Sequence, residues 1–350
     1  MQSKTKGHIS LSAIFLLLLL LAISCQSKRE ERKTERSFYY WRSVFQLNAF
    51  EEKQLRTLGV STLYIKFFDV DWNETNARPM PVAKLQTSHY SLPAGISIIP
   101  VVFITNECLQ KMDSSQVNAL AGNIHDLVFS LAGAANFKQP FTELQIDCDW
   151  TSQTRDKYFA LLKLIRSGNN IPVSATIRLH QVKFISKSGI PPVDKGLLMC
   201  YNMGDLKDPN TKNSILETAE LKKYIAGLGS YPLPLDVALP LFNWKVLFRH
   251  DVYTGLMENL PDTVFKNSFS TRKADRLEIL KDTTVAGYSF NKGDVLRDEE
   301  ARYDEIIAAA NEVSKQLKNT HPRVVLYHLD SLLLSKYSDH ELENIFNSLR

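Results

Sequence analysis

Short apolar runs alternate along the chain with longer segments in which apolar residues recur every three or four positions. A short apolar run bounded by turn residues is typical of a buried strand, and the longer spacing is typical of an amphipathic helix. Strands and helices in alternation predict parallel β/α units. The predicted strands are residues 38–45, 62–72, 95–106, 143–150, 172–179, 196–202, 235–244 and 323–329.

Eight such units over residues 37–350 match the length and rhythm of an α/β fold of the (β/α)8 TIM barrel type. A doubly wound open sheet is the alternative, but no Gly-x-Gly-x-x-Gly turn follows the first strand, so its nucleotide-binding form has no support. Residues 245–300, between strands seven and eight, break the alternation. Residues 283–290 and the turn at 291–294 predict an inserted β element there.

The first residues have the pattern of an export signal. Lys4 and Lys6 precede an apolar run at 11–23, which suits a signal-peptide core and is short for a membrane span. The sequence Ala-Ile-Ser-Cys at 22–25 resembles the bacterial lipobox. This resemblance implies a signal peptide at 1–24 and a lipidated Cys25, and Gln26 after the cysteine implies the outer membrane. An ordinary secretory signal with an incidental Cys25 is the alternative.

Residues 26–36 contain no apolar side chain and predict a charged tether that begins at Cys25. The folded domain is then 37–350. We expect the protein in the cell envelope, held to the membrane by the lipid anchor and facing either the periplasm or the cell surface.

Composition narrows the classes of partner. The chain is 44% hydrophobic and 23% charged, with a net charge of +4 spread along its length, so nothing predicts a nucleic-acid partner. Cys108, Cys148 and Cys200 have no Cys-x-x-Cys or His-rich spacing around them, and the latter two lie in apolar runs. We interpret these cysteines as buried hydrophobic residues and expect neither a metal nor a cofactor.

The fourth predicted strand carries the most unusual pattern. Asp147 and Asp149 share one face of it near its C-terminal end, where an unpaired carboxylate is costly to bury. The C-terminal ends of the strands form the active face of a TIM barrel. If the protein is a hydrolase, Asp149 would act as an acid or base, with its pKa raised by the charge of Asp147. A salt bridge to Lys66 or Arg178 is the alternative.

Other strands also end in polar or aromatic residues. Asp69 and Asp71 could instead cap the loop that follows them, and His328 could be a satisfied interior histidine. Trp150 and Trp244 could be packing residues. The predicted ligand-binding residues are Asp69, Asp71, Asn106, Glu107, Trp150, Arg178, Asn202, Trp244, Tyr327 and His328.

Two short motifs carry a family resemblance. Ile-Asp-Cys-Asp-Trp at 146–150 resembles the fourth-strand signature Asp-Gly-x-Asp-x-Asp-x-Glu of family 18 glycoside hydrolases, the chitinase-like barrels. Met-Cys-Tyr-Asn at 199–202 resembles the Met-x-Tyr-Asp motif of their sixth strand. The chain as a whole resembles bacterial lipoproteins with a barrel of this kind. The resemblance implies a catalytic group of Asp147, Asp149 and Tyr201.

The chain departs from the family pattern at the position that matters most. Thr151 stands where the family has its general-acid glutamate, and a hydroxyl cannot protonate a leaving group at neutral pH as a carboxylic acid can. Leu144 and Asn202 replace two further aspartates. Three functions follow as hypotheses: a glycoside hydrolase that uses Asp149 and a second carboxylate, a barrel that only binds a glycan, and a scaffolding lipoprotein whose acids are structural.

Overall fold

A computed structural model describes residues 32–87, 92–137, 140–258 and 260–350. The predicted signal peptide, Cys25 and the first part of the predicted tether lie outside the described residues. Eight parallel strands pair in sequence order, and the last pairs with the first, which closes the sheet into a barrel and confirms the predicted (β/α)8 fold. The barrel strands are β1 (Glu35–Tyr40), β3 (Thr62–Asn73), β6 (Ser97–Ile104), β7 (Leu144–Cys148), β8 (Val173–Arg178), β9 (Lys195–Met199), β10 (Leu235–Pro240) and β18 (Arg323–Tyr327).

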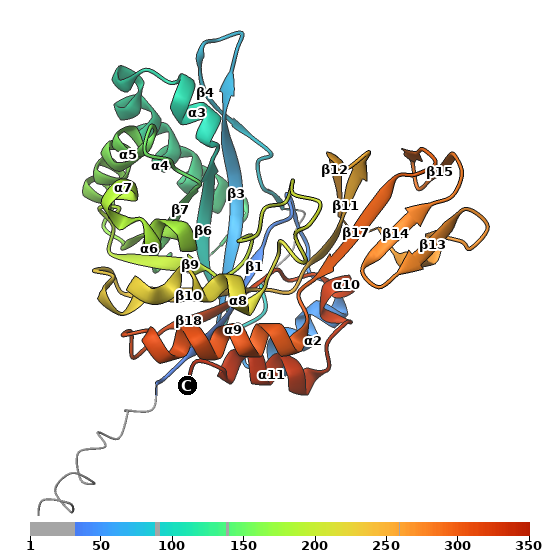
Figure 1. Cartoon of the computed structure of the whole chain (residues 1–350). Helices are drawn as coiled ribbons and strands as arrows, with labels where there is room; N and C mark the ends of the chain where they lie inside the picture. Colours follow the sequence, from blue (N-terminus) through green and yellow to red (C-terminus); the bar gives the residue numbers. More distant parts are fainter. Residues whose placement is uncertain (1–31, 88–91, 138–139, 259) are drawn as a thin grey trace, which may run out of the picture.

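Helices surround this barrel (Figure 1). Local sequence sets several of their ends. The side chain of Asn48 accepts a hydrogen bond from the backbone N–H of Glu51 at the start of α2, and Ser338 does the same for Glu341 at the start of α11. The α-helices are α2 (Ala49–Thr57), α3 (Asn106–Lys111), α4 (Val117–Ala134), α5 (Arg155–Gly168), α6 (Leu179–Lys183), α7 (Ile185–Ser188), α8 (Thr218–Lys222), α9 (Tyr303–Gln316), α10 (Ser331–Leu334) and α11 (Asp339–Asn347).

Short 3-10 helices and strands complete the connections. The 3-10 turns are η1 (Ser114–Gln116), η2 (Ile225–Ser230) and η3 (Asp262–Val264), and β2 (Val44–Phe45) pairs with β5 (Gln86–Thr87). Strand β4 (Arg78–Val82) adds to β3 in antiparallel orientation outside the closed barrel. No helix among the described residues is long and apolar enough to cross a membrane.

Two predicted strands have different ends in the structure. The run at 38–45 divides into β1 and β2, and β1 begins at Glu35, inside the range predicted as tether. Arg32 is already buried there, and its guanidinium donates hydrogen bonds to Ser314 Oγ at 2.6 Å and to the carbonyl oxygen of Leu349 at 3.1 Å. The run at 235–244 also divides, because Pro240 ends β10 and the chain then turns into β11.

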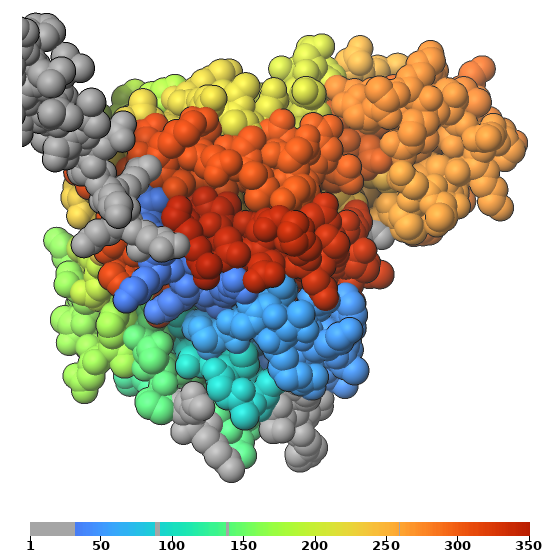
Figure 2. All heavy atoms as spheres, turned by 90° about the horizontal axis from the view of Figure 1, so that it is seen from below, coloured from blue at the N-terminus to red at the C-terminus, as the bar shows by residue number. Residues whose placement is uncertain are grey.

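The inserted β element is larger than predicted. It forms a five-stranded antiparallel sheet in the order β12, β11, β17, β14, β13, and a hairpin of β15 and β16 extends it. The strands are β11 (Asn243–Arg249), β12 (Val252–Glu258), β13 (Ser270–Lys273), β14 (Arg276–Ile279), β15 (Thr283–Val285), β16 (Tyr288–Phe290) and β17 (Val295–Glu300). Leu247, Met257, Ile279, Phe290 and Leu296 give this sheet a small core of its own. It projects to one side of the barrel, as Figures 1 and 2 show.

The barrel interior holds polar groups as well as apolar ones. The hydroxyl of Tyr39 donates to Gln145 Oε1 inside the barrel. At the N-terminal ends of the strands Arg323 reaches across to Glu143 at 2.5 Å, so this end is closed by a buried ion pair. Cys108, Cys148 and Cys200 are free and buried, as predicted, and burial raises the pKa of each thiol.

Candidate functional site

A cavity of about 270 Å³ opens at the C-terminal ends of the barrel strands, next to the inserted sheet. Loops after the strands and two strands of the inserted sheet supply its walls, so residues far apart in sequence meet there. Eight of the predicted site residues line it: Asp147, Asp149, Arg178, Tyr201, Asn202, Trp244, Tyr327 and His328. Residues that we did not predict line the rest: Tyr39, Trp41, Phe103, Met199, Phe242, Asn243, Glu258 and Leu333.

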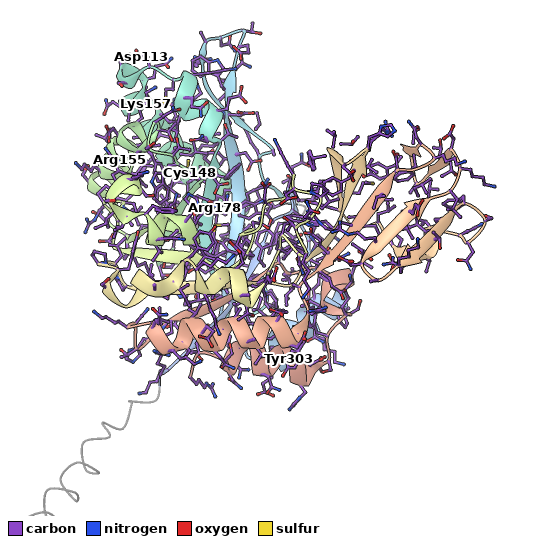
Figure 3. All side chains as sticks on the ribbon, viewed as in Figure 1. Asp113, Cys148, Arg155, Lys157, Arg178 and Tyr303 are labelled. Atoms are coloured by element: carbon purple, nitrogen blue, oxygen red, sulfur yellow. The ribbon has the colours of Figure 1, made fainter. Side chains whose placement is uncertain are left out.

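The two aspartates of β7 have different surroundings. Asp147 is buried and accepts a hydrogen bond from Thr176 Oγ1 at 2.5 Å. Asp149 is 45% exposed and forms an ion pair with Arg178 at 2.5 Å, which is one of the alternatives raised from the sequence. Figure 3 labels Arg178 on the side of the barrel that faces the inserted sheet.

The deeper of the two carboxyl groups, that of Asp147, has a raised pKa. Burial, followed by the charge of Asp149, raises the pKa of Asp147 to about 7. We expected the raised pKa at Asp149, because like-charge repulsion was the only cause visible in the sequence. The structure adds desolvation, which acts on Asp147. At neutral pH Asp147 can therefore either donate or accept a hydrogen bond.

Seven of the residues that line the cavity are Phe, Trp or Tyr. The ring of Tyr327 lies 5.5 Å from that of Tyr201 and 5.7 Å from that of Trp41, and Phe242 lies 5.1 Å from Trp244. Burial raises the pKa of both tyrosine hydroxyls, so these groups stay protonated at neutral pH. The wall therefore offers apolar ring faces with a few hydroxyl donors among them.

Two buried polar atoms of the cavity residues have no hydrogen-bond partner among the described residues. They are Asn202 Oδ1 and His328 Nδ1. Burial lowers the pKa of His328 to about 4, so its ring is neutral at pH 7. A buried polar atom without a partner costs free energy, and such atoms beside a cavity indicate a ligand that completes their hydrogen bonds.

The inserted sheet holds part of the wall in place. Trp244 Nε1 donates to Glu299 Oε2 at 2.7 Å, and the backbone N–H of Ser214 donates to the same oxygen at 3.0 Å. Arg297, which is buried and paired with Glu299, donates to the carbonyl oxygens of Leu206 and Asp208. The loop after β9 and the indole of Trp244 are therefore both tied to β17.

Four predicted residues lie outside the cavity lining. Asp69 pairs with Lys66 at 2.9 Å, and Asp71 accepts from Thr105 Oγ1 at 2.7 Å. Asn106 Oδ1 accepts from Thr154 Oγ1 at 2.7 Å, and Glu107 forms an exposed ion pair with Lys111. Asp69 is nevertheless near the cavity, because its charge adds to the raised pKa values of Asp147 and Tyr327.

Trp150 is also outside the cavity. It is buried behind β7, where its Nε1 donates to the carbonyl oxygen of Ser188 at 3.0 Å and its ring stacks on Tyr158 at 5.2 Å. Thr151 is exposed, and its backbone N–H donates to Thr154 Oγ1. The strand alternation could have predicted the place of Trp150, because it puts this residue on the face opposite to Asp147 and Asp149.

Some of the missed residues left a signal in the sequence and others did not. Trp41 left a signal as an aromatic residue of the first predicted strand, although β1 ends just before it at Tyr40. Glu258 lies in the inserted region, where nothing in the sequence shows that β12 folds back over the barrel. In the described part of the chain, no group of three or more His, Cys, Asp or Glu side chains could hold a metal ion.

No protein-family model matches the chain, and no curated protein matches its sequence. Among solved structures, the spore cortex-lytic enzyme SleL of Bacillus cereus is similar, with a TM-score of 0.51 and 12% identity over 91% of this chain and 75% of that chain. The family 18 chitinase ChiB of Flavobacterium johnsoniae has a TM-score of 0.48 and 12% identity over 90% of this chain and 94% of that chain. The likeness to SleL shows a shared barrel fold.

Proposed function

We propose that the cavity at the barrel mouth binds a glycan. Sugar rings present apolar faces that pack on aromatic rings and hydroxyl groups that donate hydrogen bonds, and the cavity offers both kinds of partner. The observation that carries the proposal is the pair of unpartnered buried atoms, Asn202 Oδ1 and His328 Nδ1, inside an aromatic wall. The fold shared with a spore cortex-lytic enzyme is compatible with this ligand class.

Binding has stronger support than hydrolysis. Thr151 supplies no carboxylic acid, and the more exposed aspartate, Asp149, forms an ion pair with Arg178. An open cavity lined by a half-exposed carboxylate also speaks against a purely scaffolding barrel, which should have a closed and dry mouth.

Hydrolysis remains a second candidate because of one observation. The pKa of Asp147, near 7, suits a group that gives or takes a proton at neutral pH. A hydrolase would release reducing ends from a panel of bacterial and host glycans, and Asp147→Asn would abolish that release. Full binding without any release of reducing ends would leave binding as the function.

We also propose that Cys25 is lipidated and holds the protein to the outer membrane. The support is the sequence Ala-Ile-Ser-Cys at 22–25 after an apolar run. Stable anchoring needs more than one acyl chain, which a lipidated N-terminal cysteine supplies. The glycan would then be one that the cell envelope or its surroundings present.

The binding proposal is tested with a glycan array, followed by calorimetry on any ligand found. Trp41→Leu keeps an apolar side chain at this position but removes a ring face from the cavity, so we expect affinity to fall about tenfold. Trp72→Leu is the matched control. Trp72 lies near the C-terminal end of β3 and is partly buried, as Trp41 is, but it does not line the cavity. An array without any bound glycan, or equal effects of the two variants, would contradict the proposal.

A further inference from the structure

Among the described residues, most charged side chains in or beside the cavity have a polar partner: the buried Asp147 accepts from Thr176. Asp149 pairs with Arg178, and Asp69 pairs with Lys66. Glu258, at the end of β12, lines the same cavity, but its side chain makes neither an ion pair nor a hydrogen bond with any residue that the structure describes. It is exposed, so its carboxylate is accessible from the cavity opening.

Glu258 lies beside the aromatic side chains of the cavity wall. Glu258 is the cross-strand partner of Trp244, so the two side chains share one face of the inserted sheet. Its charge also reaches Tyr327 on the barrel side, where it adds to the effects of burial and Asp147 on the pKa of that hydroxyl. The inserted sheet thus brings a carboxylate to the barrel mouth that the barrel strands do not supply.

One cavity residue also has a hydrogen-bond acceptor to spare. Asn202 Oδ1 is buried without a donor among the described residues. The cavity wall also attracts cations, since ring faces carry negative potential, and the ammonium of Lys66 already lies 5.6 Å from the ring centre of Trp41. Unpaired negative charge, a free acceptor and ring faces together favour a ligand that carries a positively charged donor.

We propose that the bound sugar carries a free amine, as a hexosamine without its acetyl group does, and that Glu258 is the counter-ion of that amine. This inference rests on the proposed glycan-binding function and adds the chemical class of the ligand. A protonated amine offers three N–H donors and one positive charge, whereas an acetamide offers one N–H and no charge. The cavity would therefore distinguish the two substituents by charge.

Three oligosaccharides that differ at one position test this inference. Tetramers of β-1,4-linked glucosamine, N-acetylglucosamine and glucose carry an amine, an acetamide and a hydroxyl at carbon 2 on the same backbone. We expect the full-length protein to bind the glucosamine tetramer about fivefold more tightly than the other two, the effect of one partly solvated ion pair. The preference should weaken as salt concentration rises.

Glu258→Gln should remove this preference, so that the glucosamine and glucose tetramers bind with similar affinity. Glu278→Gln is the matched control, because Glu278 is an exposed glutamate of the same inserted sheet that does not line the cavity. Equal affinity for the three tetramers, a preference for the acetamide, or an amine preference that survives Glu258→Gln would overturn the inference and leave glycan binding standing. Failure of all three tetramers to bind, while the array yields another glycan, would also overturn it. An array without any hit would overturn the proposed function too.

Discussion

At the scale of single residues, two aspartates two positions apart carry out different tasks because their surroundings differ. Asp147 loses hydration inside the barrel and retains a proton near neutral pH, whereas Asp149 faces the opening and is held by Arg178. Residue 151, two positions further along the chain, is a threonine and supplies no third carboxyl group. The local chemistry is therefore better suited to holding a ligand than to cleaving it.

The raised pKa of Asp147 makes stability depend on pH in a defined direction. Between pH 4 and about 7 the unfolded chain releases the Asp147 proton while the folded chain keeps it, so this residue lowers the free energy of unfolding as pH rises through that window. Asp147→Asn removes the effect. In urea unfolding at several pH values, the free energy of unfolding of the variant minus that of the wild type should rise by roughly 4 kcal/mol at most between pH 4 and 7.5.

His328 does not disturb that comparison. Its pKa is lowered to about 4, so in both proteins it contributes stability that is lost as pH falls below about 6.5, and this contribution cancels in the difference. A difference between Asp147→Asn and wild type that stays constant from pH 4 to 7.5 would show that the Asp147 carboxyl is ionised throughout this range.

At the scale of elements, the inserted sheet completes the mouth and also fixes it. Glu299 on β17 receives hydrogen bonds from Trp244 of β11 and from Ser214 in the loop after β9. Arg297, two residues earlier on the same face of β17, holds the backbone of that loop. One strand of the insertion thus sets the position of the cavity wall on two sides.

Glu299→Ala should therefore reduce both stability and affinity. It leaves the buried guanidinium of Arg297 without its carboxylate partner, which costs about 3 kcal/mol or more. It also removes the hydrogen-bond acceptor of the Trp244 indole. Denaturant unfolding measures the first effect, and calorimetry with the glycan ligand measures the second. Glu278→Ala, at an exposed position of the same sheet, should change stability by less than about 0.5 kcal/mol. Equal stability of the two variants would contradict the role given to Glu299.

The barrel strands were predictable because they are buried on both faces and therefore appear as continuous apolar runs. Residues at the C-terminal ends of these strands, such as Arg178 and His328, were predictable by the same reasoning. The part supplied by the insertion was not, because most of its strands mix buried and exposed positions and give no continuous apolar run. The placement of Glu258 depends on how the whole insertion folds over the mouth, and no local pattern encodes that arrangement.

At the scale of the whole molecule, the proposed lipid anchor precedes a closed barrel in the sequence. The lipid anchor is tested with Cys25→Ser in a bacterial host. The unchanged protein should incorporate a labelled fatty acid and sediment with the outer membrane, and the variant should do neither. A protein that takes up no label, or a variant that is labelled as strongly as the original, would refute the anchor. The barrel should fold in both cases, since its strands and helices lie between residues 35 and 347.

The buried side chain of Arg32 also has a consequence for orientation. It fastens the entering chain to the carbonyl oxygens of Leu317 and Leu349, beside the N-terminal end of β1 and at the C-terminal ends of the neighbouring helices α9 and α11, which lie along the face seen in Figure 2. The cavity lies at the opposite end of the strands, about 20 Å away for six residues of strand. Any attachment upstream of Arg32 would hold the barrel by its base, so the mouth would point outward from the supporting surface and meet ligands that arrive from solution.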